Sequence, residues 1–293
     1  MAKAPSRCSH DVRIAYVISA YRRPEQLLRL VSRLAADDAR FYVHVDSKTQ
    51  EPVFRTMVDG LAAFDVTFLP RHACHWGGFG HVRASLKGIA AIVDSGYDPD
   101  YTILLSGQDY PIKSNPAIRE FLATRAGRSS FLYFAIPTPH WTQGGLPRFR
   151  DWHLRWRRLH VRIPLRRSLP LGLTPWGGSA YWILSRRALD EVAGFVDEHP
   201  EYVSFFRHVD IPDESFFHTI LLNSPIAPEC DDIRLHYTEW GRTPAPAVLE
   251  TADYPHLVES PCLFARKFDP HVDADVLDLI DEHLLAVDRG GTP

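Results

Sequence analysis

Short apolar runs alternate with segments of helical periodicity through the first 115 residues of the chain. The apolar runs are rich in β-branched and aromatic residues and cover 12–20, 41–46, 64–69 and 101–106. Between them, apolar side chains recur at helical spacing over 25–35 and 81–95. Strands that alternate with helices in this order predict an α/β fold class, with a mostly parallel central sheet flanked by helices on both faces.

The pattern changes in residues 137–175, which contain prolines, tryptophans and many arginines with weak periodicity. We interpret this segment as a solvated amphipathic helix beside a flexible loop. A basic aromatic patch for RNA and a wall of an acceptor pocket stay as alternatives. The arginines concerned are Arg148, Arg150, Arg155, Arg157, Arg158, Arg162, Arg166 and Arg167, which are interleaved with Trp152 and Trp156.

The rest of the chain returns to regular patterns. A further strand is expected at 179–185, and helices are expected at 187–198, 213–222 and 273–287. With 293 residues and 45% hydrophobic content, we favour one large domain over two small ones. The expected organisation is a disordered N-terminus at 1–11 and a single domain at 12–288, divided into a nucleotide-binding half, 12–115, and an acceptor-binding and catalytic half, 116–288.

Composition narrows the classes of partner. Acidic residues outnumber basic ones, 36 to 33, so no long-range positive field would attract polyanions, and nucleic acid is not expected as a partner. The four cysteines lie far apart without a Cys-x-x-Cys pair, which is typical of reduced thiols. The chain has neither a signal-peptide pattern nor a run approaching the about 20 apolar residues of a membrane span. We therefore expect a soluble, cytoplasmic protein.

The run at 101–106 ends in Gly107-Gln108-Asp109, which places one carboxylate at the exit of a buried strand. In open α/β sheets, ligands bind beyond the carboxyl ends of the strands. A metal-dependent nucleotide-sugar enzyme would need Asp-x-Asp here to hold Mg²⁺ or Mn²⁺. With a single acid, other groups must neutralise the phosphates, and Arg266-Lys267 between aromatics supplies fixed cations. As a lone pair, these cations would more often be a solvated face.

Asp213 and Glu214 follow Pro212 at the expected start of a helix. Acids in a first turn commonly cap free amides, which is the simpler interpretation. Capping needs only one of them, and Asp213 can fill that role. Glu214 beside Phe216, Phe217 and Trp240 would then be desolvated, and a raised pKa would suit a general base.

Two glycine motifs, Trp76-Gly77-Gly78 and Trp176-Gly177-Gly178-Ser179, join a large ring to residues that permit close approach. Each is either a binding loop or a plain turn over a core tryptophan. The fifteen histidines form no His-Glu-x-x-His or His-x-His motif, although a zinc-dependent hydrolase stays as a distant alternative. Asp98-Pro99-Asp100 precedes its strand and is interpreted as a turn.

Six ordered segments carry a resemblance to a known family. They are Phe41-Tyr42-Val43-His44-Val45-Asp46-Ser47-Lys48, His75-Trp76-Gly77-Gly78, Leu105-Ser106-Gly107-Gln108-Asp109-Tyr110-Pro111-Ile112-Lys113, Gly178-Ser179-Ala180-Tyr181, Pro212-Asp213-Glu214-Ser215-Phe216-Phe217 and Leu263-Phe264-Ala265-Arg266-Lys267-Phe268-Asp269. The chain resembles the core-2/I-branching β-1,6-N-acetylglucosaminyltransferases and the peptide O-xylosyltransferases, which form one family. The resemblance runs from about residue 13 to 269.

The resemblance implies a GT-A type fold and an inverting, metal-independent transfer from a UDP-sugar, with no cofactor. Glu214 matches the family's catalytic base. Asp46 and Asp109 would contact the uridine and donor sugar, Arg23 the uracil, and Arg266 and Lys267 the diphosphate. Further donor-side candidates are Trp76, Gly77, Gln108, Thr238 and Trp240, and the acceptor-side candidates are Trp176, Gly178, Ser179, Tyr181 and Asp213.

The resemblance leaves the donor sugar and acceptor open. Ala180 after Gly178-Ser179 is similar to the core-2 enzymes, whereas the segments 214–219 and 223–225 are more similar to the xylosyltransferases. The donor is therefore N-acetylglucosamine or xylose. A bacterial type of relative is expected, acting on a glycan, a glycolipid or a small molecule, with peripheral membrane contact left open. The alternative is a catalytically silent sugar- or RNA-binding module on the same fold.

Overall fold

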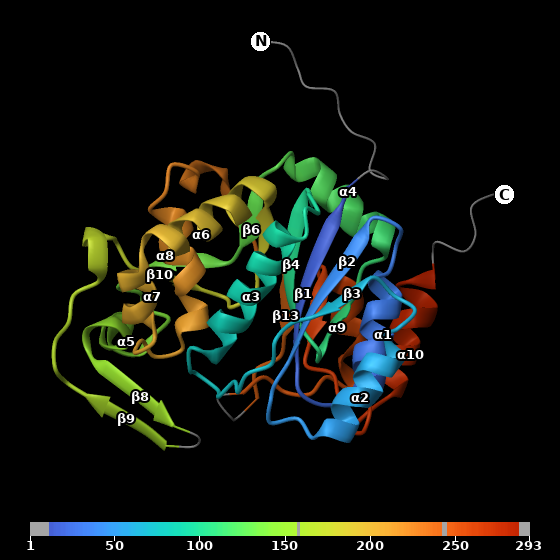
Figure 1. Ribbon diagram of the computed structural model, residues 1–293. Helices are drawn as coiled ribbons and strands as arrows, with labels where there is room; N and C mark the ends of the chain where they lie inside the picture. Colours follow the sequence, from blue (N-terminus) through green and yellow to red (C-terminus); the bar gives the residue numbers. More distant parts are fainter. Residues whose placement is uncertain (1–11, 157–158, 242–244, 287–293) are drawn as a thin grey trace, which may run out of the picture.

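The computed structural model describes residues 12–156, 159–241 and 245–286, and a seven-stranded sheet lies at its centre (Figure 1). The strand order is β12-β6-β11-β4-β1-β2-β3. β1 pairs in parallel with β2 and β4, and β2 pairs in parallel with β3, which confirms the mostly parallel sheet of the predicted α/β class. The strands are β1 (Ile14–Ala20), β2 (Ala39–Val45), β3 (Val66–Phe68), β4 (Tyr101–Ser106), β6 (Ser129–Phe131), β11 (Ile183–Ser185) and β12 (Cys230–Asp232).

Helices cover both faces of this sheet, and successive residues of β1 point alternately into the hydrophobic clusters on the two faces. Ile14, Tyr16 and Ile18 pack with α1, α2, α4, α9 and α10, whereas Ala15 and Val17 pack with α3, α6, α7 and α8. Figure 1 shows these two layers on opposite sides of the strands. The helices are α1 (Pro24–Leu34), α2 (Glu51–Gly60), α3 (Gly80–Asp94), α4 (Asn115–Arg125), α5 (Leu146–Arg150), α6 (Arg186–Glu198), α7 (Pro200–Phe206), α8 (Phe216–Leu222), α9 (Tyr254–Glu259) and α10 (Asp275–His283).

Three small sheets border the central one. β13 (His236–Thr238), β14 (Phe264–Arg266) and β5 (Asp109–Pro111) form the first, in which β14 lies between the other two. β10 (Trp176–Gly178) pairs with β7 (Tyr133–Ala135). β8 (Trp152–Trp156) and β9 (Leu159–Ile163) form an antiparallel hairpin, seen as two arrows at the lower left of Figure 1.

The structure corrects several predicted elements in the second half of the chain. Of the expected strand 179–185, only Ile183–Ser185 form a strand, β11, which runs antiparallel to β4. The helix expected from residue 213 begins only at Phe216, because Pro212–Glu214 form a separate 3-10 turn. The arginine-rich segment contains the β8–β9 hairpin where we expected an amphipathic helix. α2 and α4 were not predicted.

Some predictions lie beyond what the structure describes. The terminus 1–11, expected to be disordered, and residues 287–288 at the end of the predicted domain lie outside the described residues. In the described ranges, no helix combines the length and apolar character needed to cross a membrane.

Candidate active site

The register of the three-stranded sheet brings the two main donor-side candidates together. β4 ends at Ser106, the chain turns through Gly107-Gln108, and β5 begins at Asp109. Because β5 is antiparallel to β14, Asp109 lies directly opposite Arg266. On its other side β14 pairs in parallel with β13, which places Thr238 beside Arg266. His236 also lies on β13, so β14 separates its strand from that of Asp109.

Asp109 is completely buried, and several donors hold its carboxylate. The Ser106 amide donates to Oδ2 at 2.7 Å and the Ser106 hydroxyl to Oδ1 at 2.6 Å. Arg266 Nε donates to Oδ1 at 3.0 Å, and His236 Nε2 lies 3.4 Å from Oδ2. Burial alone would raise the pKa of Asp109, but the charge of Arg266 and the contact with His236 keep this pKa below its usual value. Asp109 therefore lies beneath Arg266 and anchors it.

Arg266 and Lys267 present positive charge above this anchor. The Arg266 guanidinium lies over the Tyr181 ring, 4.7 Å from its centroid, so one face of the cation is covered. Lys267 is half-buried, and its pKa is lowered by burial and by the neighbouring charges of Arg266 and Arg22. No acidic partner of the Lys267 ammonium is seen among the described residues. An anion placed here would relieve the repulsion between these cations.

Arg22 and Arg23 extend this cationic region, because both reach Asp269. Arg23 makes a bidentate contact to Asp269, with Nε donating at 2.7 Å and Nη2 at 3.1 Å. Arg22 Nη2 lies 3.4 Å from the same carboxylate. Gln108 ties the segment to the sheet, since the Phe268 amide donates to its carbonyl at 2.9 Å. Three arginines and a lysine thus surround two acids, Asp109 and Asp269.

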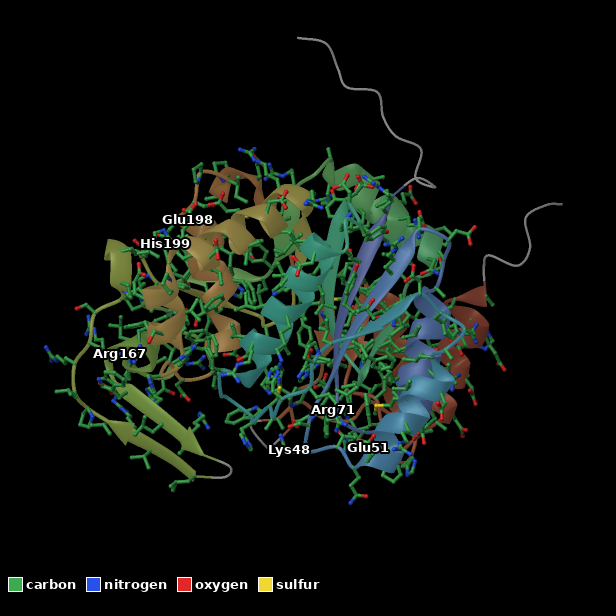
Figure 2. The ribbon with its side chains drawn as sticks, in the orientation of Figure 1. Lys48, Glu51, Arg71, Arg167, Glu198 and His199 are labelled. Atoms are coloured by element: carbon green, nitrogen blue, oxygen red, sulfur yellow. The ribbon has the colours of Figure 1, made fainter. Side chains whose placement is uncertain are left out.

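Asp46 follows β2 on the same edge of the sheet, and its loop is held by its own network. The Lys48 amide donates to Asp46 Oδ1 at 2.8 Å, and the Lys48 ammonium pairs with Oδ2. Arg71 donates to the carbonyls of Asp46 and Thr49 at 3.2 and 2.6 Å. Figure 2 shows Lys48, Glu51 and Arg71 together at the base of α2. Asp46 is therefore a buried residue that shapes this loop.

Glu214 occupies the 3-10 turn before α8, where Arg148 from α5 reaches it. Arg148 Nη1 donates to Glu214 Oε2 at 2.6 Å. Burial raises the pKa of Glu214 to about 6, against the lowering effect of Arg148 and with the help of Asp213. The predicted desolvation is present, but Arg148 was not expected there, and Trp240 is an exposed residue.

Asp213 does not cap a helix as expected. Neither the 3-10 turn nor α8 has a side-chain cap, and Asp213 Oδ1 is buried without a hydrogen-bond partner in the described structure. Its charge is among the influences that raise the pKa of Tyr181, after burial and the charge of Asp109. Tyr181 in turn underlies Arg266.

A wall of aromatic rings supports Arg148. The Arg148 guanidinium stacks over the Trp141 ring at 3.6 Å. A Cβ atom on Gly177 would lie 2.4 Å from that ring, so only glycine permits this packing. At Gly178 a Cβ atom would lie 1.9 Å from the Leu132 carbonyl oxygen. The second glycine motif therefore accommodates the chain's own backbone and Trp141. Its Trp176 ring packs edge-on against Tyr133.

The first glycine motif lies against the root of the hairpin. Gly77 has a positive φ of 68°, and a Cβ atom there would lie 2.9 Å from the Arg155 guanidinium. Arg155 pairs with Asp210 and lies over the Trp76 ring at 5.4 Å. The Ile211 amide donates to the Gly77 carbonyl at 3.1 Å. Ile211 directly precedes the Pro212–Glu214 turn, so Gly77 lies near that turn.

Two clusters of possible metal ligands occur in the described part of the chain, and neither contains Asp109 or Glu214. His44, His72 and Cys74 form the first, but the Lys87 ammonium lies 3.2 Å from His72 Nδ1 and disfavours a second cation. The second cluster, His153, His160 and Asp210, also faces a cation, because Arg155 pairs with Asp210. These sets do not fit the zinc hydrolase alternative.

Sequence reasoning missed Arg22 and the specific role of Arg148. Arg22 stands beside Arg23 in the sequence, and that doubling was the only signal for it. Arg148 was one of eight arginines, and nothing in the local pattern distinguishes it from the others.

The chain is similar to known proteins over most of its length. A family model described as Core-2/I-Branching enzyme matches residues 14–260. Xylosyltransferase 2 of Rattus norvegicus is 29% identical over 306 residues, which cover 96% of this chain and 35% of the relative. Xylosyltransferase oxt of Drosophila melanogaster is 29% identical over 316 residues, covering 97% and 35%. The chain thus spans about a third of the length of these curated relatives.

Solved structures are only distantly similar. A putative glucose-1-phosphate thymidylyltransferase from Bacillus anthracis gives a TM-score of 0.31 at 9% identity, covering 61% of this chain and 74% of that chain. The 4-diphosphocytidyl-2C-methyl-D-erythritolsynthase from Anaerococcus prevotii gives 0.34 at 10% identity, covering 65% and 76%.

Proposed function

Because the chain belongs to the core-2/I-branching enzyme family, we propose that it is an inverting glycosyltransferase that uses a UDP-sugar and no metal. The observation that carries the proposal is the pairing of β5 with β14, which holds Arg266 over a buried Asp109 and leaves Lys267 beside it. A diphosphate leaving group needs fixed positive charge, and these two cations supply it without a divalent ion.

Metal independence is supported by the chemistry of the acid at the strand exit. Both oxygens of Asp109 already accept hydrogen bonds, from Ser106 and Arg266, and the carboxylate has no exposed surface. A divalent cation would need oxygen ligands that face the ligand site. In this arrangement Asp109 serves as the support of Arg266, and Arg266 and Lys267 face the diphosphate.

Glu214 is the proposed base. In the transfer, the acceptor hydroxyl oxygen attacks the anomeric carbon, its proton moves to the Glu214 carboxylate, and the bond to UDP breaks with the electron pair leaving on the diphosphate. A carboxyl whose pKa is about 6 is ionised at neutral pH yet basic enough to accept this proton. Attack from the face opposite UDP inverts an α-linked donor to a β-linked product.

The donor sugar is N-acetylglucosamine or xylose. Similarity to xylosyltransferases over almost the whole chain supports xylose, whereas Ala180 after Gly178-Ser179 is the core-2 feature. The acceptor is a hydroxyl of a glycan, a glycolipid or a small molecule. The RNA-binding alternative loses support, because Arg148, Arg155 and Arg162 are engaged by acids of the same chain.

The proposal is tested with purified protein and a panel of UDP-sugars, by measuring binding, slow hydrolysis and transfer. Glu214→Gln removes the base but keeps the shape and a hydrogen-bonding group for Arg148. We expect turnover to fall about 100- to 10,000-fold while the affinity for UDP is unchanged. Asp232→Asn, at an exposed acid in β12, is the matched control and should keep full turnover. Wild-type turnover in Glu214→Gln would reject the assignment of the base.

A further inference from the structure

The β8–β9 hairpin has an apolar face that is exposed beyond Trp152, whose ring contacts His208 and Arg167. Its register places Leu154 opposite Val161 and Ile163 opposite Trp152 on one face of the ribbon. The exposed fractions on this face are 41% for Leu154, 58% for Leu159, 40% for Val161, 41% for Ile163, and 64% for Leu165 just beyond the strand. Contiguous exposed apolar side chains are typical of a docking surface.

The opposite face of the hairpin is attached to the body of the protein. There Arg155 pairs with Asp210 and donates to the Trp76 carbonyl at 3.4 Å, and His153 Nε2 lies 3.0 Å from the Pro147 carbonyl of α5. Because these contacts fix one face inward, the apolar face is directed outward. Figure 1 shows the hairpin at the margin of the molecule, away from the central sheet.

The positive charge around the apolar face indicates what kind of partner would bind there. Residues 146–169 contain eight arginines and one acid, Asp151, which Arg162 engages. Arg150 and Arg166 are exposed, and in the described ranges neither has an acidic partner. Figure 2 labels Arg167 at the root of the hairpin, where its guanidinium covers Trp152 at 4.8 Å. An apolar strip flanked by arginines complements the surface of an anionic bilayer.

We propose that the β8–β9 hairpin is a membrane-docking element, which inserts its apolar face into the interface of a bilayer that contains anionic lipids. A symmetric pair of chains is less favourable here, because it would bring the same arginines face to face. Arg148, two residues before Arg150, contacts Glu214, and Arg155 contacts Asp210. If the proposed function holds, docking places the base near the bilayer surface, within reach of a lipid-linked acceptor.

Vesicle flotation of the full chain tests the proposal without any need for catalysis. The probes are phosphatidylcholine vesicles with and without phosphatidylglycerol. We expect the wild type to float with the anionic vesicles and to be released by salt. Glu214→Gln should float as well as the wild type, so that failure of the proposed function does not change this result.

Matched variants distinguish docking through the hairpin from non-specific hydrophobic binding to the vesicles. Leu159→Thr/Ile163→Thr replaces two apolar side chains by a polar residue that favours strands, and should lower the bound fraction about tenfold or more. Val93→Thr/Val258→Thr makes the same kind of change at valines exposed by 41% and 45% on α3 and α9, and should bind normally. Arg150→Gln/Arg166→Gln, outside both strands, should weaken binding and its salt dependence.

Several outcomes would overturn the proposal. One is absence of wild-type flotation at low salt, and another is equal binding of the hairpin and valine variants when both keep UDP affinity and melting temperature. A dimer in sedimentation that Leu159→Thr/Ile163→Thr abolishes, without flotation of the wild type, would instead assign the face to a second copy. RNA binding lost in Arg150→Gln/Arg166→Gln, again without flotation, would assign it to nucleic acid.

Discussion

Asp109 and Glu214 are both carboxylates with an arginine partner, yet their pKa values move in opposite directions. The pKa of Asp109 lies below its usual value in spite of complete burial, whereas burial raises the pKa of Glu214 to about 6. Asp109 accepts bonds from the Ser106 amide, the Ser106 hydroxyl and Arg266, and it also faces His236. Glu214 has Arg148 as its one hydrogen-bonding side chain in the described structure, and Asp213 and Asp210 lie near it.

The difference shows how the number of donors decides the role of a buried acid. A carboxylate with three or four donors is stabilised in its charged form and serves as an anchor. A carboxylate with one donor and negative neighbours is held closer to the point of protonation, where it can exchange a proton during a reaction. In the proposed transfer, the Asp109–Arg266 pair supports the donor side, and the Glu214–Arg148 pair takes part in the chemistry.

The largest expected effect on stability follows from breaking the buried Asp109–Arg266 pair. Arg266→Leu leaves the Asp109 charge buried without its main partner, which should lower the free energy of unfolding by about 3–5 kcal/mol. Arg187→Leu, which breaks the exposed Arg187–Glu229 pair, should cost less than about 1 kcal/mol. Urea unfolding of both variants measures the contrast.

A second substitution makes this test specific to the pair. In Asp109→Asn/Arg266→Leu the uncompensated charge is gone, so part of the lost stability should return. If the double variant is as unstable as the sum of the single ones, Asp109 and Arg266 do not act as a pair.

The next effect concerns the donor. Lys267→Ala should weaken UDP binding about 10- to 100-fold, since a charge-assisted contact contributes about 1.5–3 kcal/mol. The fold should be kept, because Lys267 is half-buried and has no acidic partner among the described residues. Arg55→Ala, at an exposed arginine of α2, is the control, and calorimetric titration with UDP is the measurement.

The same titration tests the absence of a metal. EDTA should leave the wild-type affinity for UDP unchanged, because in the proposed site fixed cations neutralise the diphosphate. If EDTA weakens binding and Mn²⁺ restores it, then a divalent ion shares this role and Lys267 is not its replacement.

The sequence predicts the donor side better than the acceptor side, for a physical reason. Apolar runs and helical spacing are local signals, so β1, β2, β4, α1 and α3 were found, together with Asp109 at a strand exit. The contact of Arg148 with Glu214 joins residues 66 positions apart, and no local pattern encodes it. The pairing of Asp109 with Arg266 likewise depends on the register between β5 and β14.

The hairpin is a different kind of miss, because a local signal for it was present. Leu159, Val161 and Ile163 alternate with His160 and Arg162, which is the period of a strand. The density of arginines favoured a solvated helix instead. Apolar alternation was thus the more reliable signal, even though its apolar face is exposed rather than packed on the core.

The smallest expected effect comes from removing the Arg148 contact to Glu214. Arg148 lowers the pKa of Glu214, so Arg148→Gln should raise that pKa further above about 6. In the proposed mechanism activity depends on the ionised carboxylate, so the acid limb of the pH–rate profile should shift to higher pH by about one unit or less. Arg150→Gln, at an exposed arginine of the same helix, should leave the limb in place.

The pH dependence of the unfolding free energy provides an independent measurement of the Glu214 pKa. Its folded pKa, about 6, lies above the usual value of 4.5, so the folded state binds more protons between these pH values. The free energy of unfolding should therefore fall as pH rises through this window, by no more than about 2 kcal/mol. Glu214→Gln should remove this decline, and Arg148→Gln should extend it to higher pH. If the decline persists in Glu214→Gln, another group titrates there, and the contrast between the two carboxylates does not hold.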